Sequence, residues 1–318
     1  MKILITGAGG WLGSELTENI LKEGNFVRAF VLFTSTRLNE LKNKYVDKLE
    51  IIEGDICDAQ LVNESLKDID IVYHLAAKVH SLPKNKKDEE DFFKINTEGS
   101  KILFNNCINN NVKRVIFYST VAIYGESDYE INSESKVNPV TAYGKSKLEA
   151  EKFGMKLFEE KGLPITIIEP VTVYGGDDVG NFEKLKSLSS KGILLRFGNG
   201  ENKKTVIYYK DLISMTIQIA NSNEAIGKRI ICGTEHISIN DINEVFRELG
   251  NKRKIRFNIN NSISSFCVRT FNLIGVSLTK KIARQITVLK SNNIYDLSES
   301  KQYIKNYKLF KEYYGGEN

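Results

Sequence analysis

A glycine-rich turn follows the first predicted strand only six residues into the chain. Residues 2–6 form a short apolar run that leads directly into Gly7-Ala8-Gly9-Gly10-Trp11-Leu12-Gly13. Glycines at such a turn let the backbone bend sharply and approach a pyrophosphate, and a helix starting there directs N–H groups at the phosphates. Strand, turn and helix occur in the order that dinucleotide binding requires. We expect five residues to hold a dinucleotide cofactor: Gly7, Gly10, Trp11, Leu12 and Gly13.

Short apolar runs alternate with amphipathic stretches through the first half of the chain. Nearly continuous apolar strands are typical of a sheet covered on both faces. Strand–helix alternation of this kind predicts an α/β fold of the Rossmann type, with a doubly wound parallel sheet. The predicted strands are residues 2–6, 26–33, 50–53, 69–75, 114–118 and 165–169, and the predicted helices are residues 11–23, 60–66, 89–109 and 142–161.

The alternation becomes irregular after Pro170. We expect a dinucleotide-binding domain of residues 1–170 plus 206–232, and a smaller C-terminal substrate-binding lobe of residues 171–205 plus 233–318. The apolar segment 263–278 contains Arg269 and predicts a packed helix pair, with a helix lying on a membrane surface as the alternative. Helices are predicted over 181–191, 209–221 and 239–249, strands over 193–196, 205–208 and 229–232, and a tail over 313–318.

Composition and charge narrow the function classes. Forty-five basic and 40 acidic side chains leave a net charge of +5 over 318 residues. This basic character is too weak to indicate nucleic-acid binding, but it suits an anionic small substrate. The four cysteines and three histidines show no metal-site spacing, so we expect reduced thiols and no metal. Neither a membrane span nor a signal peptide is evident, so a cytoplasmic protein is expected.

The end of the second predicted strand indicates which dinucleotide fits. An acidic residue there would accept a hydrogen bond from the ribose 2′-hydroxyl of NAD, whereas an arginine would pair with the 2′-phosphate of NADP. Residues 30–37 contain no acid, and Arg37 is the candidate for the phosphate, with a solvent-facing side chain as the alternative. The expected cofactor is therefore NAD or NADP, with a slight preference for NADP.

Further cofactor contacts are expected after the third and fourth strands. Asp55-Ile56 fits a carboxylate that accepts from the adenine amine, and a helix cap is the alternative role of Asp55. The small side chains of Leu75-Ala76-Ala77 leave room for the cofactor, while the preceding His74 is expected to be packed.

A tyrosine and a lysine lie four residues apart in the predicted helix over 142–161. Tyr143 and Lys147 therefore share one helix face. A nearby ammonium favours the phenolate, so Tyr143 is expected to exchange protons near neutral pH, and Lys147 also to hold the nicotinamide ribose. Thr120 follows the fifth strand, at the edge of the sheet where ligands bind, and its hydroxyl can bind the substrate oxygen.

Taken in order, these motifs resemble the extended short-chain dehydrogenase/reductases, and in particular the NAD-dependent epimerase/dehydratase group. The resemblance covers nearly the whole chain. It implies a Rossmann domain with a smaller substrate lobe, a catalytic trio of Thr120, Tyr143 and Lys147, a cofactor contact at Pro170, and a homodimer formed through a helix bundle. The residues that carry it are Gly7/Gly10/Gly13, Asp55-Ile56, His74-Leu75-Ala76-Ala77, Asn96, Ser119-Thr120, Tyr124-Gly125, Tyr143, Lys147, Pro170 and Val173-Tyr174-Gly175.

Other segments resemble members of this group that act on nucleotide sugars. Lys78-Val79-His80 and Gly180-Asn181-Phe182 are similar to segments of C4 epimerases and 4-keto reductases, which implies substrate contacts at Lys78 and Asn181. The loop over residues 198–208 is similar to one in which a basic residue grips phosphate. It implies a contact at Lys204, a lysine where an arginine is usual.

Two departures from the family pattern bear on the reaction. Glu169 replaces the arginine that is usual before Pro170. Val121-Ala122 replaces the Asp-Glu pair that sugar 4,6-dehydratases use to eliminate water, which argues against dehydration.

The expected activity is NAD(P)-dependent hydride transfer at C4 of a nucleotide-activated hexose, with UDP as the expected nucleotide. A 4-epimerase is the main interpretation, and an NADPH-dependent 4-keto-sugar reductase of polysaccharide biosynthesis is the alternative. A ketoreductase of a non-nucleotide substrate and a non-catalytic NAD(P)H-binding protein are further alternatives.

Overall fold

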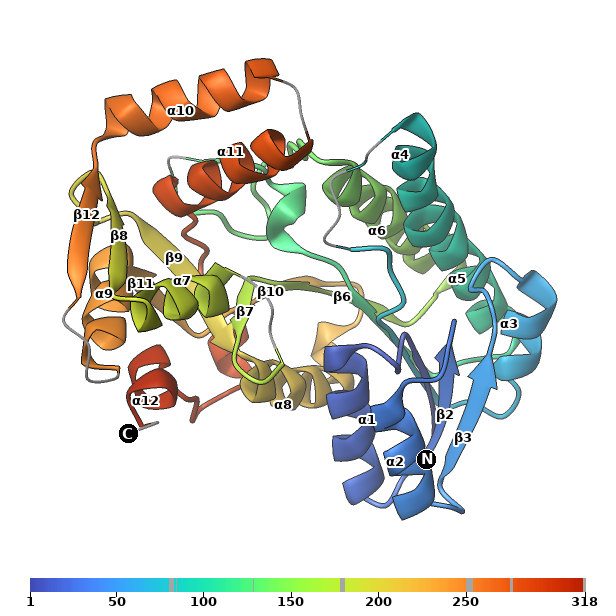
Figure 1. Cartoon of the computed structure of the whole chain (residues 1–318). Coiled ribbons are helices and arrows are strands. Elements are labelled where there is room, and N and C mark those ends of the chain that lie inside the picture. The colour runs from blue at the N-terminus through green and yellow to red at the C-terminus, as the bar shows by residue number, and fades with distance from the viewer. Residues whose placement is uncertain are drawn as a thin grey trace. The chain divides into compact units, whose positions relative to one another are not determined.

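The chain divides into two structural units (Figure 1). The computed structural model describes residues 1–79, 83, 85–127, 129–177, 181–249, 254–274 and 277–316. His80 and Gly180, which belong to the predicted substrate motifs, lie outside these residues. The first unit consists of Met1–Gly125, Ser133–Pro170 and Leu212–Cys232, and the second of Glu126–Asn132, Val171–Asp211 and Gly233–Asn318.

The first unit is built on a seven-stranded sheet in which every neighbouring pair of strands is parallel. The strand order is β10-β6-β5-β4-β1-β2-β3, so the chain moves outward from β1, crosses to β4 and moves outward on the other side. This order confirms the predicted doubly wound sheet. The strands are β1 (Lys2–Thr6), β2 (Phe26–Val31), β3 (Leu49–Glu53), β4 (Ile71–His74), β5 (Arg114–Tyr118), β6 (Ile165–Pro170) and β10 (Arg229–Cys232).

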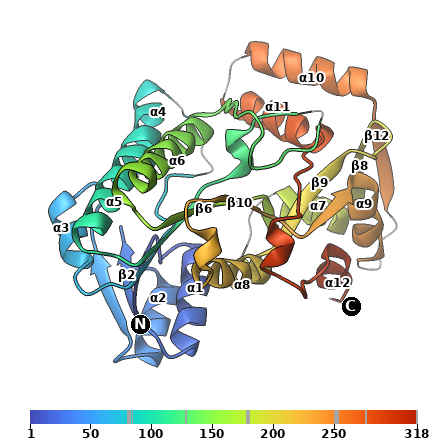
Figure 2. The ribbon, with the colours of Figure 1, turned by 180° about the vertical axis from the view of Figure 1, so that it is seen from behind.

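Helices cover this sheet on both sides (Figure 2). On one side, side chains of α3, α5 and α6 form a continuous apolar core with the strands, and Phe104 lies at its centre beside Phe117 of β5. On the other side, α1 and α2 lie next to each other. The helices are α1 (Trp11–Lys22), α2 (Thr36–Lys44), α3 (Ala59–Ser65), α4 (Lys86–Phe92), α5 (Gly99–Asn109), α6 (Ala142–Lys161) and α8 (Tyr209–Ala220), of which α8 begins in the second unit.

Two helical features of the first unit differ from the sequence prediction. α2 is an additional helix, anchored by the buried Leu38 and Leu41 and capped by Ser35, whose hydroxyl accepts the N–H of Leu38 at 3.3 Å. The single helix predicted over 89–109 is instead α4, a π-helical stretch over Phe93–Glu98, and α5. π-helical turns often occur at functional sites, and this one contains Asn96.

The second unit contains two small sheets. β9 lies between β11 and β7, so residues 206–208 pair within this unit and not with the seven-stranded sheet. β8 pairs in parallel with β12. Its strands are β7 (Thr172–Tyr174), β8 (Ile193–Phe197), β9 (Lys203–Tyr208), β11 (Glu235–Ser238) and β12 (Ile255–Ile259), and its helices are α7 (Asn181–Ser190), α9 (Ile239–Glu248), α10 (Asn261–Ile274), α11 (Ser277–Lys290) and α12 (Phe310–Gly315).

The C-terminal segment is packed, so the predicted tail is wrong for residues 313–315. Phe310 and Tyr314 lie four residues apart on α12, are buried, and have ring centroids 4.7 Å apart. Tyr174 of β7 stacks on Tyr314 with centroids 6.1 Å apart. This aromatic face holds α12 within the second unit. The predicted helix pair over 263–278 corresponds to most of α10 and the start of α11.

Within the described residues, no helix combines the length and apolar character needed to cross a membrane. The same part of the chain holds no group of three His, Cys, Asp or Glu side chains placed to bind a metal ion. Cys57, Cys107 and Cys232 are free thiols.

Candidate active site

The glycine-rich turn joins β1 to α1 and is packed closely against neighbouring backbone atoms. Gly7 has a φ of +73°, and a Cβ atom there would lie 2.7 Å from the backbone that follows β4. A Cβ atom on Gly13 would lie 2.2 Å from the carbonyl oxygen of Gly7. Gly10 is the N-cap of α1, and no side chain in the described structure caps that helix, which opens with the half-buried Trp11 and Leu12. The first-turn N–H groups therefore face the turn, which fits the pyrophosphate of a dinucleotide.

The segment after β4 lies beside this turn. Thr6, at the end of β1, accepts the N–H of Leu75 on its carbonyl at 3.1 Å and the N–H of Ala76 on its hydroxyl at 3.2 Å. Leu75, Ala76 and Ala77 are half-buried at this edge of the sheet, where the sequence predicts cofactor contacts. His74 is fully buried with hydrogen-bond partners on both ring nitrogens, and burial lowers its pKa well below the usual range. It is a neutral, packed side chain.

Asp55 and Ile56 have different surroundings. The exposed carboxylate of Asp55 accepts the N–H of Cys57 at 2.9 Å, and the N-cap of α3 is Asp58, so Asp55 is not the helix cap. Ile56 is buried against α5, where a Cβ atom on Gly99 would lie 2.6 Å from it. Asp55 is thus placed beyond β3 with its outer oxygen open to solvent, and Ile56 supports it from the core.

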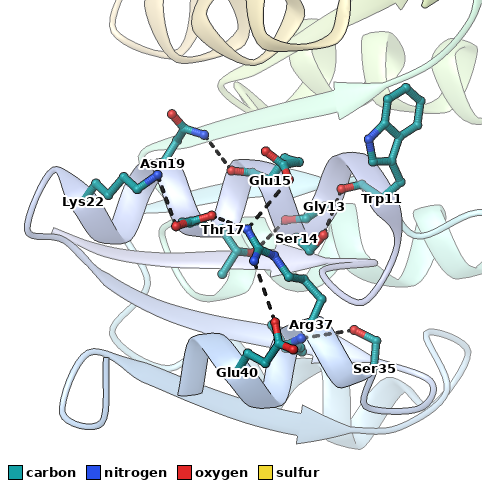
Figure 3. A network of polar contacts seen from close by, with 12 residues as sticks. Trp11, Gly13, Ser14, Glu15, Thr17, Asn19, Lys22, Ser35, Arg37 and Glu40 are labelled. Atoms are coloured by element: carbon teal, nitrogen blue, oxygen red, sulfur yellow. Dashed lines mark hydrogen bonds and ion pairs between the residues drawn. The ribbon is translucent and has the colours of Figure 1, made fainter. Parts of the chain in front are cut away.

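Arg37 is surrounded by acidic side chains (Figure 3). Its guanidinium hydrogen-bonds to Glu18 of α1 and lies 3.9 Å from a carboxylate oxygen of Glu15 and 3.8 Å from one of Glu40. Lys22 pairs with Glu18 as well, at 3.1 Å. The charge of Arg37 is therefore matched inside the protein, and a 2′-phosphate would have to compete with these carboxylates. The predicted preference for NADP therefore loses the support of Arg37, and only the lack of an acid in residues 30–37 still favours it.

Tyr143 lies in the first turn of α6, which Thr141 caps. The side chain of Thr120 lies close enough to its phenol to influence the pKa of Tyr143, so the structure brings two of the predicted catalytic residues together. Burial raises the pKa of Tyr143 to about 12, and the side chain of Thr120 acts in the opposite direction. Burial of the phenol therefore acts against the expected lowering of this pKa by Lys147, which stays a prediction.

Lys147 follows Tyr143 by one turn on the same helix face and is only 1% exposed. Its ammonium lies 4.0 Å from the centroid of the Phe117 ring. Burial lowers its pKa to about 7, and the carboxylate of Glu151, one further turn along α6, acts in the opposite direction. In the described part of the chain the ammonium has no hydrogen bond or ion pair. A buried cation without oxygen partners is costly, and such groups are concentrated at functional sites.

Glu151 completes a row of three ionisable side chains on α6 with Tyr143 and Lys147. Its Oε1 accepts the hydroxyl of Ser119, and its Oε2 has no hydrogen-bond partner among the described residues. Burial raises the pKa of Glu151, against the effects of Ser119, Arg229 and Lys147. Glu151 is absent from the predicted site, although the four-residue spacing that pairs Tyr143 with Lys147 also points to it.

Asn96, in the π-helical stretch, ties the segment after β4 to α6. Its Oδ1 accepts the N–H of Lys78 at 2.7 Å, and its Nδ2 donates to the carbonyl of Lys78 at 3.1 Å and to the hydroxyl of Ser146 at 3.0 Å. The ammonium of Lys78 pairs with Asp88 at 3.1 Å and Asp91 at 3.0 Å. Lys78, the predicted substrate contact, therefore has its charge matched by two carboxylates.

The other predicted substrate contacts lie in the second unit. Lys204 of β9 is 5% exposed, and its ammonium donates to the carbonyls of Val288 and Ser291 and to Oδ1 of Asn293 at 2.7 Å. It thereby binds the C-terminal end of α11 to β9, and the structure gives it this packing role in place of an open position for phosphate. Asn181 opens α7, and its side chain lies outside the described part of the chain.

The two departures from the family pattern lie at the carboxyl edge of β5 and β6. Pro170 ends β6, and Glu169 before it is fully buried and accepts the hydroxyl of Tyr124 at 2.7 Å. Val121 and Ala122 belong to a short 3₁₀ turn after β5. Apolar side chains thus occupy the positions at which a dehydratase would supply its acid and base.

The sequence matches the model of a known protein family. The model of the NAD dependent epimerase/dehydratase family matches residues 3–233. The chain belongs to this family, which confirms the resemblance in the sequence. It is thus a member of a family of NAD-dependent enzymes, and its relatives include proteins named as UDP-glucose 4-epimerases.

Relatives and solved structures agree with this assignment. A UDP-glucose 4-epimerase of Lactobacillus helveticus is 31% identical over 68% of this chain and 71% of its own length. A UDP-glucose 4-epimerase of Vibrio cholerae is 28% identical over 74% of this chain and 71% of its own. The crystal structure of UDP-glucuronic acid 4-epimerase from Bacillus cereus in complex with NAD superposes with a TM-score of 0.77, at 24% identity, over 99% of this chain and 98% of the other.

Proposed function

We propose that the protein is a UDP-sugar 4-epimerase that oxidises and then reduces C4 of a hexose. The observation that carries the proposal is the row on α6: Tyr143 in contact with Thr120, and beside it the buried Lys147 without an oxygen partner in the described structure. The relatives named as UDP-glucose 4-epimerases support the choice of reaction and nucleotide.

The first unit would hold the cofactor. The glycine turn receives the pyrophosphate, Asp55 accepts from the adenine amine, and the segment Leu75-Ala76-Ala77 borders the nicotinamide half. NAD held there would supply the acceptor and then the donor of hydride for the sugar carbon. NAD is the proposed form, since the carboxylates around Arg37 oppose a 2′-phosphate.

The side chains on α6 and Thr120 would move the proton. Tyr143 removes the proton from the 4-hydroxyl as hydride leaves C4, and Thr120 holds the same oxygen through its hydroxyl. Lys147 binds the ribose hydroxyls, and its positive charge stabilises the phenolate. Once the 4-keto sugar presents its other face, Tyr143 returns the proton to the oxygen at C4.

The second unit would hold the sugar nucleotide. Asn181 remains a proposed diphosphate contact, whereas Lys78 and Lys204 would have to give up protein partners to bind one. A homodimer formed through a helix bundle, as the family resemblance implies, is part of the proposal. Light scattering of the purified protein tests it.

An NADPH-dependent 4-keto-sugar reductase is the second candidate. The pKa of Tyr143, raised to about 12, favours it, because a protonated phenol is the donor that a 4-keto oxygen requires. The absence of an acid in residues 30–37 favours NADPH as well. A dehydratase is not favoured, because Val121 and Ala122 offer no acid or base.

The test is turnover followed by proton NMR. Purified protein is incubated with UDP-glucose or UDP-N-acetylglucosamine and no added cofactor, and the anomeric signals are recorded. An epimerase forms the galacto isomer, and Tyr143→Phe is expected to lower the rate roughly 10³-fold. Tyr118→Phe, which alters another buried phenol, is the control. No conversion without cofactor, together with NADPH oxidation by a 4-keto sugar, would replace the epimerase with the reductase.

A further inference from the structure

One stretch of the second unit is strongly basic although the chain as a whole is not. No acidic residue occurs between Glu248 and Asp296, whereas nine lysines and arginines do. The rest of the chain holds 36 basic and 40 acidic side chains, so the excess positive charge of the protein comes from this stretch. It comprises β12, α10 and α11.

The same stretch exposes large apolar side chains. On β12, Ile255 is 61% and Phe257 49% exposed, and on α10, Ile263 is 57% and Phe266 70% exposed. α10 follows β12 directly (Figure 1), so these four side chains lie on consecutive elements of one unit. A cluster of exposed large apolar side chains marks an interaction site more often than scattered single ones do.

Basic side chains accompany the apolar ones. Arg269 is exposed on α10 one turn beyond Phe266, whereas the exposed Arg256 lies on the opposite face of β12 from Ile255 and Phe257. An open hollow between α10 and α11 is lined by Phe266, Arg269 and Lys290, among others. We call Ile255, Phe257, Ile263, Phe266 and Arg269 the basic–apolar surface.

We propose that the basic–apolar surface docks the second unit on an anionic lipid bilayer. An amphipathic helix lies on a bilayer with its apolar side chains between the headgroups and its basic side chains at the phosphates. Each lysine or arginine near an anionic membrane adds attraction, and an acidic side chain in the stretch would cancel it. The lack of acids in the stretch that carries exposed Ile255 and Ile263 fits this occupant best, because nucleic acid gains little from these two aliphatic side chains.

Co-sedimentation with vesicles tests the proposal on the full chain. The probes are vesicles of phosphatidylcholine mixed with phosphatidylglycerol and vesicles of phosphatidylcholine alone. We expect binding to the mixed vesicles, weaker binding as salt is raised, and little binding to the neutral ones. Absence of binding to the mixed vesicles at low salt would overturn the proposal.

Surface variants then locate the contact. Ile263→Ser with Phe266→Ser is expected to weaken binding about tenfold, and Arg269→Glu at least about fivefold. Val46→Ser and Lys305→Glu, which change exposed side chains elsewhere, are the matched controls and are expected to bind like the unaltered protein. Binding that the surface variants leave unchanged would also overturn the proposal.

A tryptophan variant tests the proposal by fluorescence if the serine variants fold poorly. Phe266→Trp keeps an apolar side chain, and its fluorescence is expected to shift to the blue on mixed vesicles, with the unaltered protein correcting for Trp11. An unshifted spectrum counts against insertion. If the serine variants instead abolish a concentration-dependent dimer and no vesicle is bound, the surface belongs to a second copy of the chain and the proposal is wrong.

Discussion

Each unit contains a deeply buried lysine, and the two side chains differ in what they contact. Burial lowers the pKa of both Lys147 and Lys204 to about 7. Lys204 has backbone carbonyls and the amide oxygen of Asn293 around its ammonium. Lys147 has an aromatic ring below it and the charge of Glu151 one turn away, with no hydrogen bond in the described structure.

These contacts indicate a packing role for Lys204, whereas the ammonium of Lys147 is available to a ligand. The desolvation cost of the Lys204 ammonium is offset inside the protein by oxygen acceptors, so the side chain fastens α11 to β9. The Lys147 ammonium lacks this compensation in the described structure and is therefore poised to bind hydroxyl oxygens of a ligand. The same substitution, lysine to methionine, should therefore lower catalysis at Lys147 and stability at Lys204.

The largest expected effect is on catalysis by Lys147→Met. Methionine fills the space without the charge, so we expect kcat to fall roughly 10²- to 10³-fold, because the phenolate and the ribose lose their cation. The free energy of unfolding should be unchanged or higher, since a costly buried charge is removed. Steady-state kinetics and urea titration measure both, with the exposed Lys152→Met on the same helix as the control. Near-normal kcat would remove Lys147 from the mechanism.

Lys204→Met should have the opposite signature. The carbonyls of Val288 and Ser291 lose their donor, so the free energy of unfolding is expected to fall by about 2 to 4 kcal/mol. KM for the UDP-sugar should stay unchanged, and the adjacent exposed Lys203→Met is the control. A raised KM with unaltered stability would restore the phosphate contact that the sequence predicts.

A pH series sharpens the contrast. The pKa of Lys147 is lower in the folded state, so between about pH 7 and the ordinary lysine range near 10.5 the unfolded chain binds one more proton than the folded one. Stability from this group therefore rises with pH, by at most about 1.4 kcal/mol per unit. The quantity to follow is the free energy of unfolding of the unaltered protein minus that of Lys147→Met. We expect this difference to rise between about pH 7.5 and 9.5, by up to about 1.4 kcal/mol per pH unit. Lys204 is present in both proteins and cancels, so a flat difference would show that Lys147 stays charged.

The smallest expected effect is at Arg37. Because carboxylates of Glu15, Glu18 and Glu40 already match its charge, Arg37→Ala should change the affinity for NADPH by no more than about threefold. Fluorescence titration with NADH and NADPH measures it. A loss of NADPH affinity by more than about tenfold would show that Arg37 leaves its partners for a 2′-phosphate.

Local patterns predicted the sheet and the helix α6 of the candidate site. Residues close together in the sequence determine three features. They are the apolar run before Gly7, the spacing of the glycines, and the placement of Tyr143 and Lys147 on one face of α6. The resemblance to the family, whose model matches residues 3–233, reached the same arrangement from the order of the motifs.

Features set by distant residues could not be predicted in this way. α2 has few apolar residues and depends on Leu38 and Leu41 reaching the core. The residues whose carbonyls accept from Lys204 are more than 80 residues away, and the sequence around Lys204 does not predict them. The pKa of Tyr143 follows from burial by the surrounding fold, whereas the spacing to Lys147 alone suggests the opposite direction.

The dinucleotide that the purified protein carries tests the central claim most directly. Denaturing freshly purified protein and identifying the released nucleotide by mass and absorbance should give NAD⁺ from the unaltered chain and from Lys204→Met, and much less from Lys147→Met. Such a result would support an epimerase whose cofactor is regenerated in place and whose ribose contact is Lys147. A site that releases nothing and takes up NADPH from solution would contradict the epimerase, and NAD⁺ retained by Lys147→Met but lost from Lys204→Met would reverse the roles of the two lysines.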